Sequence, residues 1–174
     1  IYAGVAADGK VWRYDAVKKA ASVFFDSGQA HITSLWYCRA DKRLYVGTAE
    51  KGAVYSIDEA GNAKAEYQTS DHIVTGAVKD SKGNLFVATA APGHFYKIRT
   101  SGEADTLATS EGFYSLVYDP SSDTVFAGDA EGDVAAGGIR LALWLNRDLR
   151  GRGVAHEHSK SCDVSLVQGI HGHA

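Results

Sequence analysis

Two histidines, His31 and His72, have the spacing of a repeated chemical group. Each lies 13 residues before an apolar run, the first beginning at Leu44 and the second at Leu85. A neutral imidazole binds metal ions readily, so histidines arranged around one opening could form a metal site. The third equivalent position holds Gly112. The sequence therefore does not predict a complete histidine ring, and we expect no metal.

Three short segments carry a second set of polar candidates and differ more from one another than their flanking residues do. The segments are 6–9, 49–52 and 91–94, and their candidate residues are Asp8, Glu50, Lys51 and His94. Variable loops on a constant frame are common binding sites. We predict a ligand or partner surface here, the alternative being ordinary solvated turns.

Catalytic and cofactor motifs are missing from the sequence. It has no G-x-S-x-G elbow, phosphate-binding loop or dinucleotide fingerprint. We therefore predict no catalytic residue and no cofactor. The formal net charge of −3 gives no basic surface for nucleic acid, and no membrane-spanning stretch or signal peptide is visible.

The elements that would position these residues repeat about every forty residues. Four matching runs begin 43, 41 and 40 residues apart: Ile1–Gly4, Leu44–Gly47, Leu85–Ala88 and Val125–Gly128. Short segments rich in Val, Ile, Tyr, Phe and Thr alternate with Gly, Asp and Asn, which is typical of strands and tight turns. A period of this size indicates β-propeller blades.

The second copy shows the expected blade in full. Strands A to D are predicted at 32–38, 44–48, 53–58 and 63–69, in a four-stranded antiparallel meander. We therefore predict an all-β fold, a partial β-propeller of about three to three and a half such blades, over residues 1–134. We expect residues 135–174 to be an atypical tail, a degenerate or non-native end without blade spacing except for a possible strand at 139–145. The alternative is a helix or strand that caps the last blade.

The blade spacing resembles that of WD40-like propellers, in a degenerate form. Ala30-His31 and Asp71-His72 stand where that family has Gly-His, and Tyr14-Asp15 and Ile57-Asp58 stand where it has Trp-Asp. The sequence resembles NHL and streptogramin-lyase-like propellers almost as closely as it resembles WD40-like ones. The resemblance implies that the D–A and B–C loops share one face around a channel. It also implies that His31 and His72 are structural.

These observations favour a non-enzymatic binding or scaffold module that presents its loop face to a protein or a small molecule. One alternative is a streptogramin-lyase-like or lactonase-like enzyme with a metal at the channel mouth. Another is a structural repeat segment of a larger chain. The sequence contains no methionine, so we expect a piece of a longer protein, and the compartment stays open. An incomplete ring leaves free edges, and a homodimer of about seven blades could complete it.

Overall fold

The computed structural model describes residues 1–136, which form twelve β-strands. The strands are β1 (Tyr2–Gly4), β2 (Lys10–Asp15), β3 (Ala20–Asp26), β4 (His31–Cys38), β5 (Arg43–Ala49), β6 (Ala53–Ile57), β7 (Ala63–Gln68), β8 (Ile73–Lys79), β9 (Leu85–Ile98), β10 (Ala104–Asp119), β11 (Thr124–Asp129) and β12 (Val134–Ala136). Residues 137–174, which hold most of the expected tail and its possible strand, lie outside the described residues.

The strands form four successive antiparallel blades. Blade 1 is β1–β3 and supplies strands B, C and D, whereas blade 2 is the complete meander β4–β7. Blade 3 takes β8, both halves of β9 and the first half of β10. Blade 4 takes the second half of β10 with β11 and β12. The predicted strand succession is confirmed, and β12 adds a strand C to the last blade.

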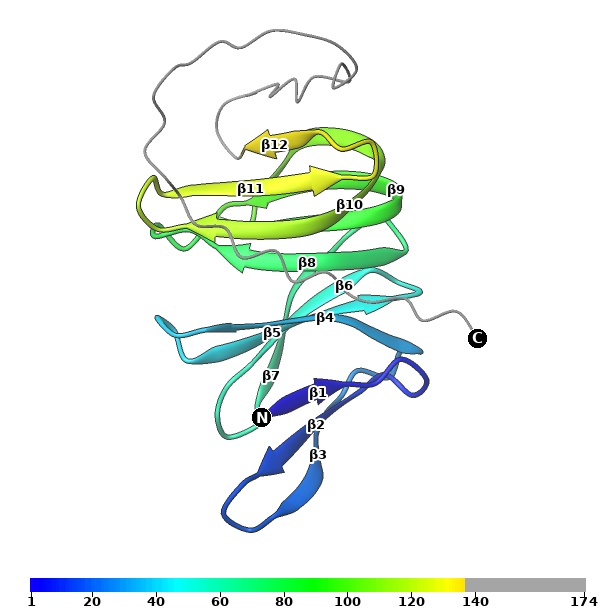
Figure 1. Cartoon of the computed structure of the whole chain (residues 1–174), viewed down its shortest axis with the longest axis vertical. Coiled ribbons are helices and arrows are strands. Elements are labelled where there is room, and N and C mark those ends of the chain that lie inside the picture. Colours follow the sequence, from blue (N-terminus) through cyan, green and yellow to red (C-terminus); the bar gives the residue numbers. More distant parts are fainter. Residues whose placement is uncertain (137–174) are drawn as a thin grey trace, which may run out of the picture.

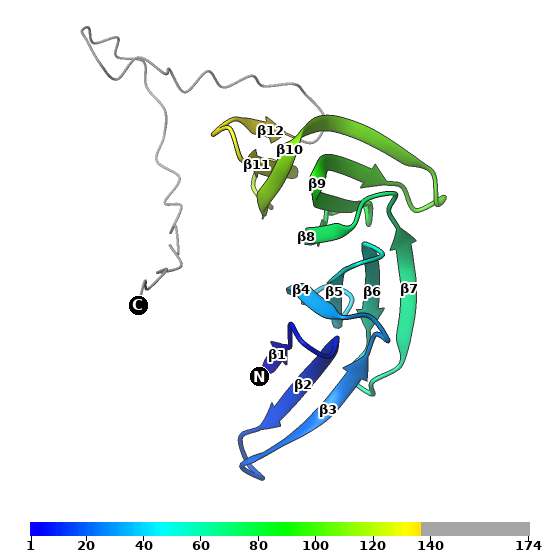
Figure 2. The ribbon, with the colours of Figure 1, turned by 90° about the vertical axis from the view of Figure 1, so that its right-hand side faces the viewer.

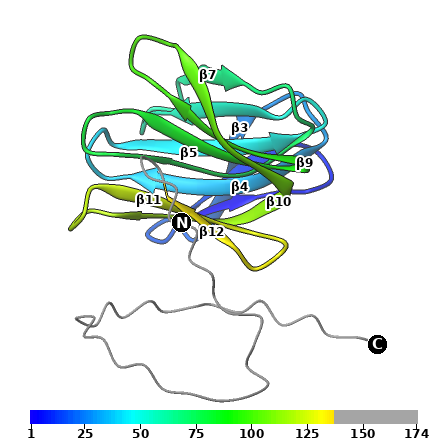
Figure 3. The same cartoon turned by 90° about the horizontal axis from the view of Figure 1, so that it is seen from above.

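The blades follow one another along an arc. Figure 1 shows them stacked along the long axis of the molecule, and Figure 2 shows them spread like a fan, with β4 and β8 on the concave side and β3 and β7 on the convex side. Seen from above, the blades overlap (Figure 3). The described residues therefore form part of a propeller with strand A innermost.

Apolar side chains fill the space between neighbouring blades, in three clusters. Val11 of blade 1 packs with Leu44, Val46 and Ile57 of blade 2. Tyr45 and Val54 on the other face of blade 2 pack with Val74, Leu85 and Val87 of blade 3. Phe86 and Phe95 of blade 3 pack with Phe113, Val125 and Ala127 of blade 4. Strand alternation explains this, because successive residues of one strand face opposite neighbours.

The same irregularity recurs in the innermost strand of blades 2, 3 and 4. The pairing of strands A and B shifts by one residue between Ile32 and Ser34, between Val74 and Gly76, and between Phe113 and Ser115. Ile32, Val74 and Phe113 are thus equivalent. Matching the copies by their histidines placed Ile32 opposite Ile73, one residue out of register. His31, which begins β4, is therefore equivalent to Ile73, and His72 lies in the loop before β8.

Candidate functional site

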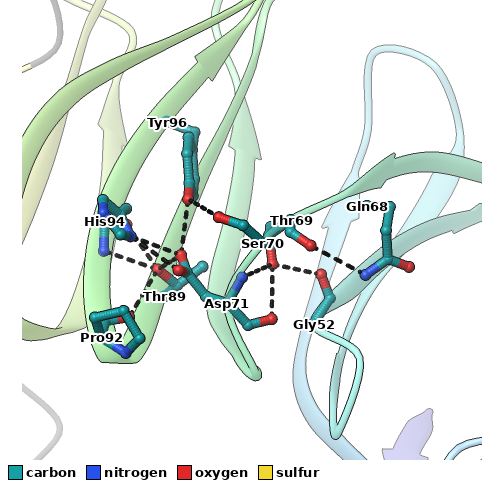
Figure 4. A network of polar contacts seen from close by, with 9 residues as sticks. All are labelled: Gly52, Gln68, Thr69, Ser70, Asp71, Thr89, Pro92, His94 and Tyr96. Atoms are coloured by element: carbon teal, nitrogen blue, oxygen red, sulfur yellow. Dashed lines mark hydrogen bonds and ion pairs between the residues drawn. The ribbon is translucent and has the colours of Figure 1, made fainter.

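The strongest polar cluster lies at the loop end of blade 3, around Asp71 (Figure 4). The carboxylate of Asp71 is almost fully buried and accepts hydrogen bonds from the hydroxyl of Thr89 at 2.6 Å and that of Tyr96 at 2.9 Å. Nδ1 of His94 lies 2.9 Å from both carboxylate oxygens. The cluster joins the D–A loop, which leads into strand A, to strands B and C, the two halves of β9.

The local fold gives Asp71 its position. Its backbone N–H donates to Oγ1 of Thr69 at 3.2 Å, and the same hydroxyl donates to the carbonyl oxygen of Gly52 at 2.8 Å. Gly52 has a φ of 56°, and a Cβ there would strike the carbonyl oxygen of Asp71. Glycine is needed because it adopts positive φ without a side chain, and it lets the B–C loop of blade 2 lie against the D–A loop.

Burial and the Asp71 carboxylate set the acidity of Tyr96. Burial, followed by the hydrogen bond to Asp71, raises the pKa of Tyr96 to about 12, because a tyrosinate would be poorly solvated and repelled by the carboxylate. Burial raises the pKa of neighbouring Tyr67 as well, again with a contribution from Asp71. Both phenols therefore stay protonated at neutral pH, and that of Tyr96 donates its hydrogen bond to Asp71.

His94 is the member of this cluster that can reach a ligand. A quarter of its side chain is exposed, against 2% for Asp71. When Asp71 is ionised, it accepts the Nδ1 proton of a neutral ring, and Nε2 then carries a lone pair. A carboxylate that fixes the tautomer in this way prepares Nε2 to accept a hydrogen bond, take a proton or ligate a metal ion.

Blade 2 contains a simpler version of the same cluster. Gln29 replaces Asp71 there: its Oε1 accepts from the hydroxyl of Thr48 at 2.9 Å, and its Nε2 donates to the hydroxyl of Tyr55 at 3.3 Å. Ala53 occupies the position of His94, since its backbone N–H also donates to the threonine hydroxyl. The carboxylate and the imidazole together thus distinguish blade 3 from blade 2.

The predicted loop residues converge in part. Nδ1 of exposed His72 lies 3.2 Å from the carbonyl oxygen of Glu50. The backbone of Lys51 is held by Gln29, whose Oε1 accepts from its N–H at 3.3 Å, and by the amide of Gln68. His31 pairs with Ala49, the residue before Glu50. These residues share one end of blades 2 and 3 with His94.

Asp8 stands apart from this group. Its carboxylate forms an ion pair with Lys10 at 3.0 Å and accepts the Lys10 backbone N–H, so it is bound within its own loop. Asp71, Thr89, Tyr96 and Gln29 were not among the residues predicted from the sequence. Strands B and C were matched correctly, so the recurrence of Thr48 as Thr89 and of Tyr55 as Tyr96 was a visible signal. The equivalence of Gln29 and Asp71 needed the corrected register of the D–A loop.

One acidic group among residues 1–136 has ligand atoms close enough for a metal ion: Asp129, Glu131 and Asp133, within 4.8 Å of one another. A structural role explains it. The carboxylate of Asp129 accepts hydrogen bonds from the backbone N–H groups of Glu131 and Asp133, and Gly132 between them has a φ of 88°. The same five-residue turn recurs at 58–62 and 80–84, each with Asp first, Gly fourth and Asn fifth. The group belongs to this turn.

Sequence comparison finds no matching family model and no matching curated protein. Structure comparison finds β-propellers. A chain of the nidogen/laminin complex is 13% identical, with a TM-score of 0.64, over 78% of this chain and 53% of that chain. The Malassezia sympodialis allergen Mala s 1 is 16% identical, with a TM-score of 0.60, over 78% of this chain and 55% of the allergen.

A luciferin-regenerating enzyme is 19% identical, with a TM-score of 0.51, over 70% of this chain and 44% of the enzyme. These structures are six-bladed propellers, and the chain spans about half of their length. The likeness confirms an all-β propeller fold, whereas the particular propeller family stays a prediction. Identities this low establish the fold alone, since one fold carries many functions. No helix among residues 1–136 has the length and apolar character to cross a bilayer.

Proposed function

We propose that this chain is a non-enzymatic binding module of a WD40-like propeller. Its binding surface is the loop end of blades 2 and 3, and it takes a small molecule or a protein segment rich in hydrogen-bonding groups. The observation that supports this most is the location of Glu50, Lys51, His72 and His94 at one end of two adjacent blades, with the His72 ring 3.2 Å from the carbonyl oxygen of Glu50. They offer a carboxylate, an ammonium group and two imidazoles on a firmly held backbone.

The rigidity of the surrounding loops supports the proposal. Glu50 has a φ of 86° and its equivalent in blade 3, Ala91, has a φ of 57°. The unusual backbone conformation therefore belongs to the fold and recurs, while the side chain it carries differs. Gln29 binds the B–C loop of blade 2 through the backbone of Lys51, and Asp71 binds that of blade 3 through His94. Groups ordered before binding lose less entropy when a ligand arrives.

The Asp71–His94 pair favours a second candidate, a metal-dependent propeller enzyme. An imidazole oriented by a carboxylate is a common metal ligand and general base. This candidate requires a divalent ion at the loop end, with Nε2 of His94 as one ligand and further ligands from His72 and Glu50. It makes a prediction about metal binding that the first candidate does not.

Nuclear magnetic resonance of the ¹⁵N-labelled full chain tests both candidates. The chain would be titrated with a library of small carboxylates, sugars and short peptides, and separately with Zn²⁺ and Ca²⁺. We expect shifts in the amides of 49–53, 70–73 and 93–95 with members of the library. Lys51→Ala and His72→Ala should weaken them at least fivefold, whereas Lys82→Ala, in an A–B turn at the opposite end, should not.

The other outcomes are decisive. Saturable shifts with a metal ion alone, lost in His94→Ala, would favour the enzyme candidate over the binding module. Shifts confined to the A–B turns, or none with any library member or metal ion, would contradict both candidates. They would favour the third possibility, a structural segment.

A further inference from the structure

The blades pack on one another in a constant direction. Each blade has a trailing face that covers the next blade and a leading face that covers the previous one. On the trailing faces of blades 2 and 3, Tyr45, Val54, Phe86 and Phe95 are each 2% exposed or less. On the leading face of blade 2, Leu44 and Ile57 are 3% and 1% exposed. An apolar face thus meets an apolar face at each internal junction.

Blade 4 repeats the trailing pattern without a described blade beyond it. Strand pairing places Phe126 and Val117 at the positions of Phe86 and Val78. Val78 is 5% exposed and Val117 is 53% exposed. Tyr114, at the position of Thr75, is 64% exposed, whereas the hydroxyl of Thr75 donates to the carbonyl oxygen of Phe113 in the next blade.

Blade 1 repeats the leading pattern at the opposite end of the arc. Strand pairing places Ile1 and Tyr14 at the positions of Leu44 and Ile57. Ile1 and Tyr14 are 82% and 40% exposed. Trp12 lies between them in the pattern, and its partner Val23 on β3 is 46% exposed. Large apolar groups exposed together mark an interaction surface.

We propose that the trailing face of blade 4 docks on the leading face of blade 1 of a second copy of this chain. The two faces are the complementary halves of a junction that the chain makes three times within itself, between blades 1 and 2, 2 and 3, and 3 and 4. A second copy therefore supplies a partner of the required shape and apolar character, and docking removes both faces from water.

The contact is head-to-tail, because it joins two different surfaces. Such contacts close into a ring if the rotation between copies permits and otherwise continue as an open chain. Four blades in each copy give eight for two copies, rather than the seven expected from about three and a half blades per copy. Eight still lies within the usual range of about four to eight.

Light scattering after size-exclusion chromatography tests the contact on the full chain. We expect a mass of at least twice the 18.5 kDa of one chain, rising with protein concentration if the assembly is open. Val117→Lys blocks the trailing face and Tyr14→Lys blocks the leading face, so each variant alone should have the mass of one chain. Val17→Lys is the matched control, because Val17 is 93% exposed in a turn outside both faces, and it should behave as the unaltered chain.

Mixing the two blocked variants makes the test directional. Val117→Lys keeps its leading face and Tyr14→Lys keeps its trailing face, so the mixture should form one-to-one dimers and nothing larger. Circular dichroism would confirm that both variants are folded. A single-chain mass for the unaltered protein at every concentration would overturn the proposal, and so would continued self-association of either blocked variant. Loop-end ligand binding is read separately, so failure here leaves the binding proposal standing.

Discussion

At the residue scale, the distinctive feature is one buried carboxylate shared by three donors. Asp71 accepts from Thr89, Tyr96 and His94, and all three belong to β9. A donor left without its acceptor inside a protein costs about 1–3 kcal/mol, so this cluster fixes the loop end of blade 3. Its elevated tyrosine pKa also gives it a measurable pH signature.

Tyr96 should make folding stability fall in alkaline solution. The phenol has its ordinary pKa of 10.0 in the unfolded chain and a pKa of about 12 in the folded one. Between these two pKa values the folded state holds more protons than the unfolded state. The contribution of Tyr96 to stability is therefore complete below pH 10 and is lost as the pH rises towards 12.

Urea unfolding of Tyr96→Phe and of the unaltered chain from pH 9 to 12 measures this contribution. The free energy of unfolding should decline less steeply with pH in the variant. Tyr45, whose pKa is also raised by burial and Asp41, remains in both proteins as an internal reference. Parallel declines would contradict the assignment.

Sequence analysis predicted the loop residues of this site but not its buried anchor. Glu50, Lys51 and His94 stood out because their loops differ between copies, and His72 stood out because its spacing matches that of His31. Asp71 appeared only as the residue before His72, because matching His31 with His72 shifted the D–A loop by one position. A one-residue slip exchanges the two faces of a strand, which hid the equivalence of Gln29 and Asp71.

At the scale of single elements, the B–C and C–D loops show two different uses of glycine. Gly52 and Gly102 both have positive φ, at 56° and 92°. A Cβ on Gly52 would meet the carbonyl oxygen of Asp71 and Oγ1 of Thr69, whereas one on Gly102 would meet nothing within 4 Å. Gly102 therefore serves backbone conformation alone, and Gly52 also permits a close approach of two loops.

Substituting Gly52 and Gly102 distinguishes the cost of backbone strain from the cost of steric crowding. Gly102→Ala should lower the free energy of unfolding by about 1–2 kcal/mol, the cost of a left-handed alanine. Gly52→Ala should cost about 2 kcal/mol more, because the two loops must also move apart. Urea unfolding at pH 7 measures both. Equal losses would show that the loops yield freely at Gly52.

Strand bounds were predictable where turn chemistry is strong. In blade 2, the predicted strands 32–38 and 44–48 agree with β4 and β5 to within one residue at each end, because the polar segment 39–42, with Asp41 in it, marks the turn between them. The shift between Ile32 and Ser34 was not predictable, since a bulge depends on the neighbouring strand rather than on local preference.

At the scale of the whole molecule, each blade is supported by its neighbours rather than by one central core. The three apolar clusters lie between different pairs of blades and have no buried residue in common. Stability in such an array is a sum of blade and junction contributions. The repeat period predicted this arrangement, because an inner blade needs a neighbour on each of its two faces. The period did not predict what covers the outer faces of blades 1 and 4.

Damage to one junction should therefore stay local. Phe95 is fully buried between blades 3 and 4, so Phe95→Ala should cost about 3–5 kcal/mol. Hydrogen exchange should show lost protection in β9, β10 and β11 while β5 and β6 stay protected. Leu44→Ala, in the cluster between blades 1 and 2, is the matched control and should reverse this pattern. A uniform loss of protection in both variants would mean that the arc unfolds as one unit, and the junctions could not then be treated as separate contributions.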